Sequence, residues 1–104
     1  MQKLQAGERS DPYAHNAQGV QHALGGRLAE AVTCFRAAVA LKPDFAEGRN
    51  NLALVLKEQG SLDEAVIVYA EALALRPDFP EAHYNLALAL LKRGDLSAGW
   101  PEHE

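Results

Sequence analysis

Residues 46–79 read AEGRNNLALVLKEQGSLDEAVIVYAEALALRPDF, and the segments on both sides repeat this 34-residue unit. The tripeptide Pro-Asp-Phe at residues 43–45 returns at residues 77–79, and Asn-Leu-Ala-Leu at residues 51–54 returns at residues 85–88. Glycines recur with the same period at residues 26, 60 and 94. A fixed period of this length is typical of proteins in which similar supersecondary units stack side by side.

The unit predicts two helices separated by a glycine. Apolar residues recur three or four apart in both halves, as on one face of a helix: Leu52, Ala53, Val55 and Leu56, then Leu62, Ala65, Val66, Tyr69, Ala72 and Leu73. Gly60 lies between the two halves, where the end of a helix needs a left-handed residue that glycine adopts at low cost. Pro77 ends the second helix, because the residue before a proline is pushed out of the helical region.

Both helices of the unit are preceded by a sequence typical of a capping box. We expect Asp44 to accept a hydrogen bond from a first-turn N–H while Glu47 reaches back to the start of the helix. Ser61 and Glu64 have the same spacing before the second helix. The sequence therefore predicts a reciprocal side-chain cap at each start.

Small and aromatic residues alternate at fixed places in two successive units. In the first unit these residues are Gly19, Ala31, Phe35, Ala38 and Pro43, and in the second they are Ala53, Ala65, Tyr69, Ala72 and Pro77. This series resembles the tetratricopeptide repeat of bacterial-type arrays, from Pro12 to about Trp100. The resemblance implies an all-α, right-handed α-solenoid of helix-turn-helix repeats that serves as a protein–protein interaction scaffold. Small residues let two helices approach closely, and the aromatic ring fills the space beside them.

The repeat divides the chain into four parts: a polar leader at residues 1–11, repeat 1 at 12–45, repeat 2 at 46–79 and a partial repeat 3 at 80–104. In repeat 1 we expect Ser10 or Asp11 to cap a helix from about residue 13 to 24, and a second helix to cover 28–41. Gln18 and His22 occupy the positions of Leu52 and Leu56, so the first helix has the polar outer face that a terminal repeat needs.

Repeat 3 is incomplete. Its first helix should begin near residues 79–80 and reach about Lys92, before Gly94. The second helix is at most one or two turns long, because Pro101 interrupts it. Leu86 and Leu90 would then be left partly uncovered, which favours either self-association as a homo-oligomer or a longer natural chain. The end of the chain also resembles the last repeat before a bacterial transferase domain, so a third hypothesis is the recognition arm of such an enzyme.

Composition excludes several classes of function. The chain has 104 residues, 48% of them hydrophobic, and a formal net charge of −4, so no attraction to nucleic acid or to an anionic membrane is expected. Its apolar runs are too short to cross a bilayer, and its first residues do not resemble a secretory signal. The single cysteine, Cys34, excludes an internal disulfide. We expect a cytoplasmic protein.

The resemblance also implies where a partner binds. In this family the first helices of successive repeats line a concave groove, and the corresponding peptide-binding residues here are Tyr13, Asn16, Glu47, Asn50, Asn51, Leu54, Glu81, Tyr84, Asn85 and Leu88. Asn51 and Asn85 lie at the same position of consecutive repeats, similar to the asparagine ladder of O-linked glucosaminyl transferases. Each carboxamide can donate to and accept from the backbone of a peptide. Alternatively, these amides are solvated or bond a neighbouring helix, and the two tyrosines pack between helices.

Nothing in the sequence indicates catalysis. It contains no phosphate-binding glycine loop, nucleophile motif or metal-ligand spacing. His15 and His83 are two repeats apart, and Cys34 in mid-helix is typical of a small apolar core residue. We therefore predict a non-enzymatic module without metal or cofactor, whose partner is a protein or peptide.

Overall fold

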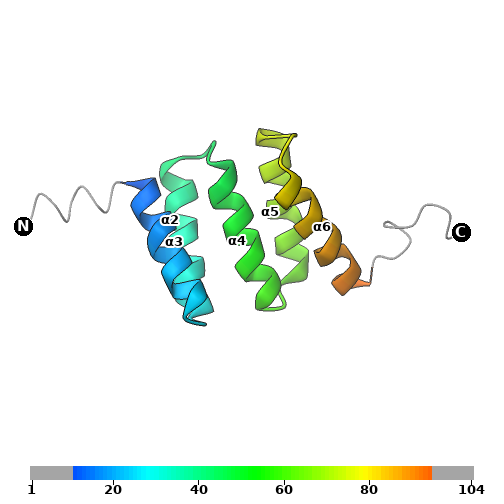
Figure 1. Ribbon diagram of the computed structural model, residues 1–104, viewed down its shortest axis with the longest axis horizontal. Helices are drawn as coiled ribbons and strands as arrows, with labels where there is room; N and C mark the ends of the chain where they lie inside the picture. The colour runs from blue at the N-terminus through cyan, green and yellow to red at the C-terminus, as the bar shows by residue number, and fades with distance from the viewer. Residues whose placement is uncertain (1–10, 95–104) are drawn as a thin grey trace, which may run out of the picture.

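The computed structural model describes residues 11–94, and this part of the chain is an array of helices with no strand. The helices are α2 (Pro12–Leu24), α3 (Leu28–Leu41), α4 (Ala46–Glu58), α5 (Leu62–Leu75) and α6 (Pro80–Arg93). Figure 1 shows α2, α4 and α6 side by side on the near side of the array, with α3 and α5 behind them. The predicted all-α repeat fold is confirmed.

The turns follow the recurring glycines. Gly26, Gly60 and Gly94 have φ values of 80°, 87° and 93°, and no other residue among those described has a positive φ. An L-residue with a side chain is strained in this region, so the period of the glycines fixes where each first helix ends. At the start of α2, Asp11 caps the helix by accepting a hydrogen bond of 2.9 Å from the backbone N–H of Tyr13. Both features agree with the sequence.

The two predicted capping boxes are wrong. At α4 the N-cap is Phe45, which makes no side-chain cap, and Asp44 lies one residue too early. Its carboxylate instead accepts a hydrogen bond of 3.1 Å from Lys42 Nζ, which lowers the pKa of Asp44. At α5 the N-cap Ser61 likewise makes no side-chain cap. Glu64 is held there by Arg36 of the preceding repeat, at 2.9 Å.

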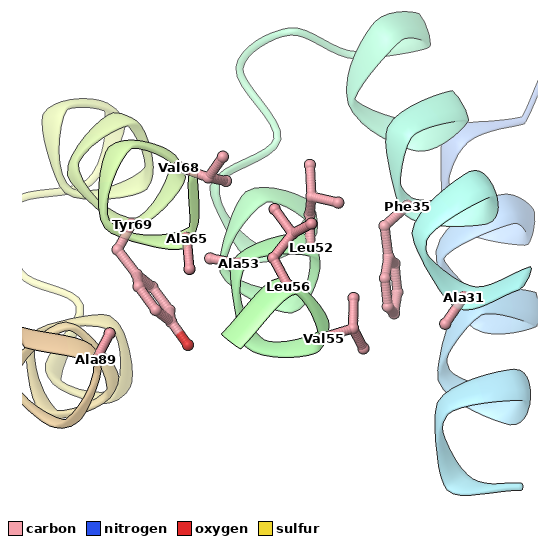
Figure 2. Close-up of a cluster of buried hydrophobic side chains, with 10 residues drawn as sticks. All are labelled: Ala31, Phe35, Leu52, Ala53, Val55, Leu56, Ala65, Val68, Tyr69 and Ala89. Carbon is pink, nitrogen blue, oxygen red and sulfur yellow. The ribbon is translucent and has the colours of Figure 1, made fainter. Parts of the chain in front are cut away.

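Close contact between paired helices needs one helix to lack a side chain. A Cβ on Gly19 of α2 would lie 2.5 Å from Phe35 Cε1 of α3, so only glycine fits at this position. Ala53 and Tyr69 make the equivalent pair in repeat 2, and both are fully buried. Figure 2 shows Phe35 and Tyr69 on opposite sides of α4, within one cluster of buried hydrophobic residues. This core holds α4 in contact with both neighbouring second helices.

At equivalent positions of two repeats, a side chain of the first helix is hydrogen-bonded to the loop that precedes that helix. Arg49 of α4 donates to the carbonyl oxygen of Pro43 from Nη2 at 2.9 Å and from Nε at 3.2 Å, and also contacts Glu71 at 3.0 Å. His83 of α6 lies one period later, and its Nε2 is 2.9 Å from the carbonyl oxygen of Pro77. The fourth residue of these units therefore fixes the loop between repeats.

The ends of the array differ as the sequence indicates. Gln18 is exposed, and His22 is half-buried and accepts a hydrogen bond of 2.9 Å from Arg27 Nε. Their counterparts Leu52 and Leu56 are buried. The short second helix predicted for repeat 3 and most of the predicted leader lie outside the described residues, and the predicted repeat boundaries stay a prediction.

Candidate functional site

The predicted groove residues gather on one face. They come from α2, α4 and α6, which lie next to each other in Figure 1. We call this surface the first-helix face. Its residues differ in accessibility, in three groups: exposed Tyr13, Glu47, Glu81 and Tyr84; half-buried Asn16, Asn51, Leu54, Asn85 and Leu88; and buried Asn50.

Asparagines bond to each other across adjacent first helices. Asn51 Nδ2 of α4 donates to Asn16 Oδ1 of α2 at 2.9 Å, and Asn85 Nδ2 of α6 donates to Asn50 Oδ1 of α4 at 3.4 Å. Both pairs join residues 35 apart, so each donor meets a residue one position earlier in the preceding repeat. These contacts match the alternative in which the amides connect neighbouring helices.

The same contacts leave part of each amide available. The bonds of Asn51 and Asn85 each use one N–H of the amide, at 2.9 Å and 3.4 Å respectively, and leave the carbonyl oxygen as an acceptor. Within residues 11–94, neither carbonyl oxygen has an assigned donor. Asn50 differs, because only 7% of its surface is exposed and its oxygen is already used. The first-helix face thus carries two amide oxygens at equivalent positions of consecutive repeats.

The two tyrosines lie in different surroundings. The Tyr13 ring packs edge-on against Phe45 with centroids 5.3 Å apart, although 60% of the residue is exposed. Tyr84 is 67% exposed. Tyr13 therefore has a packing role on one edge, while both rings keep a surface that another molecule can contact.

A hollow that the sequence did not predict lies between α2 and α4. Its volume is about 160 Å³, and its lining is Val20, Ala23, Leu24, Phe35, Asn51, Leu54 and Val55. Phe35 comes from the second helix of repeat 1 and forms part of the wall. The groove residues predicted from the sequence lie on first helices only, so they do not include Phe35. One sequence signal was present: Ala23 is small where the later repeats have Lys57 and Leu91.

No group of three or more His, Cys, Asp or Glu residues within residues 11–94 could hold a metal ion. Cys34 lies in α3, and burial, together with the charge of Glu30, raises the pKa of its thiol. A raised pKa keeps the thiol protonated at neutral pH, whereas the reactive form of cysteine is the thiolate.

Paired helices that stack on copies of themselves, with the first helices forming a continuous face, define a helical-repeat protein. A family model described as TPR repeat matches residues 19–60 and 53–94. The chain belongs to the TPR repeat family, whose repeats are generally non-catalytic scaffolds for protein–protein interaction. No described helix is both long enough and apolar enough to cross a membrane.

Solved structures of similar fold include two of MamA, both with a TM-score of 0.79 and 23% identity over 83% of this chain. They also include a mutant O-GlcNAc transferase from Thermobaculum terrenum, with a TM-score of 0.76 and 36% identity over 78% of this chain. The chain spans 47% and 50% of the MamA chains and 16% of the transferase chain. No curated protein matches the sequence. At 23% identity the likeness to MamA concerns the fold alone.

Proposed function

We propose that this chain binds an extended peptide segment of a partner protein on its first-helix face. The observation that carries the proposal is the pair of carbonyl oxygens on Asn51 and Asn85. Each can accept a hydrogen bond from a backbone N–H of the ligand, a group that every residue except proline has. Binding through these oxygens would therefore depend little on the ligand's side chains.

The spacing of the two amides suits an extended ligand. Adjacent helices pack roughly 8–10 Å apart, and an extended chain advances about 3.3 Å per residue. One repeat therefore corresponds to about three ligand residues, and Asn51 and Asn85 would accept from backbone N–H groups that far apart. The exposed rings of Tyr13 and Tyr84 lie in the first and last helices of the same face and can extend the contact.

The test begins with the selection of random 12-residue peptides on the intact chain and a measurement of their Kd by fluorescence anisotropy. The double variant Asn51→Ala, Asn85→Ala should raise Kd roughly 5- to 150-fold, because each lost neutral hydrogen bond contributes about 0.5–1.5 kcal/mol. Full affinity in this variant would remove the two amides from the proposal.

Asn16→Ala is the matched control. It removes the acceptor of the Asn51 N–H but leaves the Asn51 carbonyl oxygen in place. If the amides serve the ligand, this change should lower the free energy of unfolding and alter Kd less than the double variant does. If the amides only join helices, Asn16→Ala and Asn51→Ala should have equal effects on stability and none on binding.

Self-association is a second candidate, favoured by the apolar side chains of α6. Leu91 is 41% exposed, and Leu86 and Leu90 are only partly buried. A second copy packed on this helix would cover them. Sedimentation equilibrium separates this proposal from the first, because a monomer at high concentration contradicts self-association and leaves peptide binding untouched.

A role as the recognition arm of a larger transferase is favoured by the 36% identity to part of the O-GlcNAc transferase chain. The length of the natural reading frame tests this hypothesis. A frame without a transferase domain would contradict it.

A further inference from the structure

The hollow between α2 and α4 has the chemistry of a side-chain pocket. Its lining contains no charged residue, and Asn51 is its one polar member. Leu24 lies at its edge with 80% of its surface exposed, which is the largest exposure among the large apolar residues of the described range. Exposed apolar surface beside a concave site is typical of a ligand-binding position.

We infer that this pocket takes one uncharged apolar side chain, aliphatic or aromatic, of a peptide bound on the first-helix face. The inference rests on the proposed peptide-binding function and adds a side-chain preference to it. A volume of about 160 Å³ is close to that of an engineered cavity of about 150 Å³ that binds benzene. A side chain of the size of leucine, methionine or phenylalanine therefore fits.

The lining also decides against charged occupants. A carboxylate or ammonium group in this pocket would lose part of its hydration without meeting an opposite charge among the lining residues, which disfavours it. An apolar side chain loses nothing comparable, and it covers the half-buried Val20, Ala23 and Leu54. The pocket therefore selects by polarity first and by size second.

Asn51 links the pocket to the ligand backbone. Its Nδ2 is held by Asn16 at 2.9 Å, and the residue also lines the pocket. A ligand residue that donates its backbone N–H to this oxygen can place its own side chain, or that of a neighbour, in the pocket. Backbone recognition and side-chain recognition then occur at one point of the face.

The second repeat interface differs in the residues that correspond to the pocket. Ala23 is replaced there by Lys57, Leu24 by Glu58 and Phe35 by Tyr69. The corresponding place between α4 and α6 thus has two charged residues and a phenol. The apolar preference should apply to one ligand position only, the one next to Asn51.

Ala23→Leu tests the inference by filling the pocket. Position 23 is equivalent to Leu91 of repeat 3, and leucine is a good helix former, so the fold should accept the change. Peptides selected on the native chain should lose affinity at least about tenfold, since burial of one such side chain contributes about 1.5–3 kcal/mol. Ala29→Leu is the control, because residue 29 is exposed on α3 and outside the pocket.

The peptides themselves give the second measurement. For a selected peptide, replacement of its anchor leucine, methionine or phenylalanine by glutamate or lysine should weaken binding to the native chain by at least about tenfold and have little further effect on Ala23→Leu. Peptides that bind but show no apolar anchor, or that bind Ala23→Leu as tightly as the native chain, overturn the pocket and leave the peptide-binding function standing. Failure of all peptides to bind overturns both.

Discussion

Position 35 and position 69 are equivalent, and the difference between them is one hydroxyl group. Phe35 and Tyr69 are both buried aromatic residues of second helices. Within the described structure, the Tyr69 hydroxyl is buried without a hydrogen-bond partner. Burial and the nearby charge of Glu58 raise the pKa of Tyr69, so the phenol stays neutral. A buried donor without a partner costs stability.

Tyr69→Phe should therefore raise the free energy of unfolding, by about 1 kcal/mol. Urea denaturation measures this change, and Phe35→Tyr is the matched control, which should lower stability by a similar amount. A loss of stability in Tyr69→Phe would contradict the argument and would indicate that the hydroxyl bonds an ordered water molecule.

Cys34 allows a prediction that depends on pH. Burial and Glu30 raise the pKa of its thiol above the ordinary value of 9.0, so the thiolate is scarcer in the folded chain than in the unfolded one. Alkylation by iodoacetamide at pH 8 should be slower in buffer than in urea, and Glu30→Gln should speed it in the folded chain. The raised pKa also makes stability depend on pH, because the folded chain holds the Cys34 proton more tightly than the unfolded chain does. The stabilisation from the protonated thiol is fully present below pH 9.0 and is lost as pH rises through the pKa of Cys34 in the folded chain.

A faster reaction in the folded chain than in urea would contradict this account of Cys34. The Glu64→Gln variant serves as a control, because Glu64 pairs with Arg36 and is not among the causes of the shift. It should leave the alkylation rate unchanged.

At the scale of single helices, the sequence predicted positions well wherever the cause is local. The second helix of repeat 1 was predicted at 28–41 and is found as Leu28–Leu41, because a left-handed glycine and a proline bound it. The capping boxes failed because their side chains are out of register or paired elsewhere. Asp44 lies one residue before the N-cap Phe45 and pairs with Lys42, and Glu64 pairs with Arg36 of another repeat. A motif of four residues contains no information about such partners.

The contact between α2 and α3 gives a prediction at this scale. Gly19→Ala gains up to about 1 kcal/mol of helix propensity but places a Cβ 2.5 Å from the buried ring of Phe35, which must then shift from its packed position. Overpacking of this kind costs about 1–3 kcal/mol, so we expect a net loss of stability on thermal or urea unfolding.

A double-mutant cycle separates the two effects. In a Phe35→Leu background the ring is absent, and Gly19→Ala should become neutral or stabilising. If Gly19→Ala costs the same in both backgrounds, the close approach of α2 and α3 is not the reason for the glycine.

For the whole molecule, periodicity predicted the array but not the connections across it. The asparagine pairs span 35 residues, one more than the period, because neighbouring first helices are offset by one position. An alignment of the repeats places Asn51 opposite Asn85. It does not indicate that Asn51 bonds to Asn16 or that Asn85 bonds to Asn50. The pocket between α2 and α4 was missed for a related reason, since Phe35 and Val55 were assigned only to the core.

The array also predicts an uneven distribution of stability. In stacked repeats each unit contacts only its neighbours, so the central helices have more contacts than the outer ones. Seven of the 13 residues of α4 are buried, whereas α2 has only Gly19 and α6 has Ala82 and Ala89. Native-state hydrogen exchange should therefore show the slowest amides in α4 and α5, and lower opening free energies in α2 and α6.

Asn16→Ala sharpens this last prediction, because it removes the bond between α2 and α4 without touching α6. It should speed exchange in α2 more than in α5 or α6, while Arg93→Ala, which removes the 3.2 Å contact with Asp63, should act mainly on α6. Equal opening free energies in all the described helices, before and after these changes, would mean that the array unfolds as one cooperative unit. Nearest-neighbour contacts alone would then not explain its stability, and coupling through the hydrophobic cluster around α4 would have to dominate.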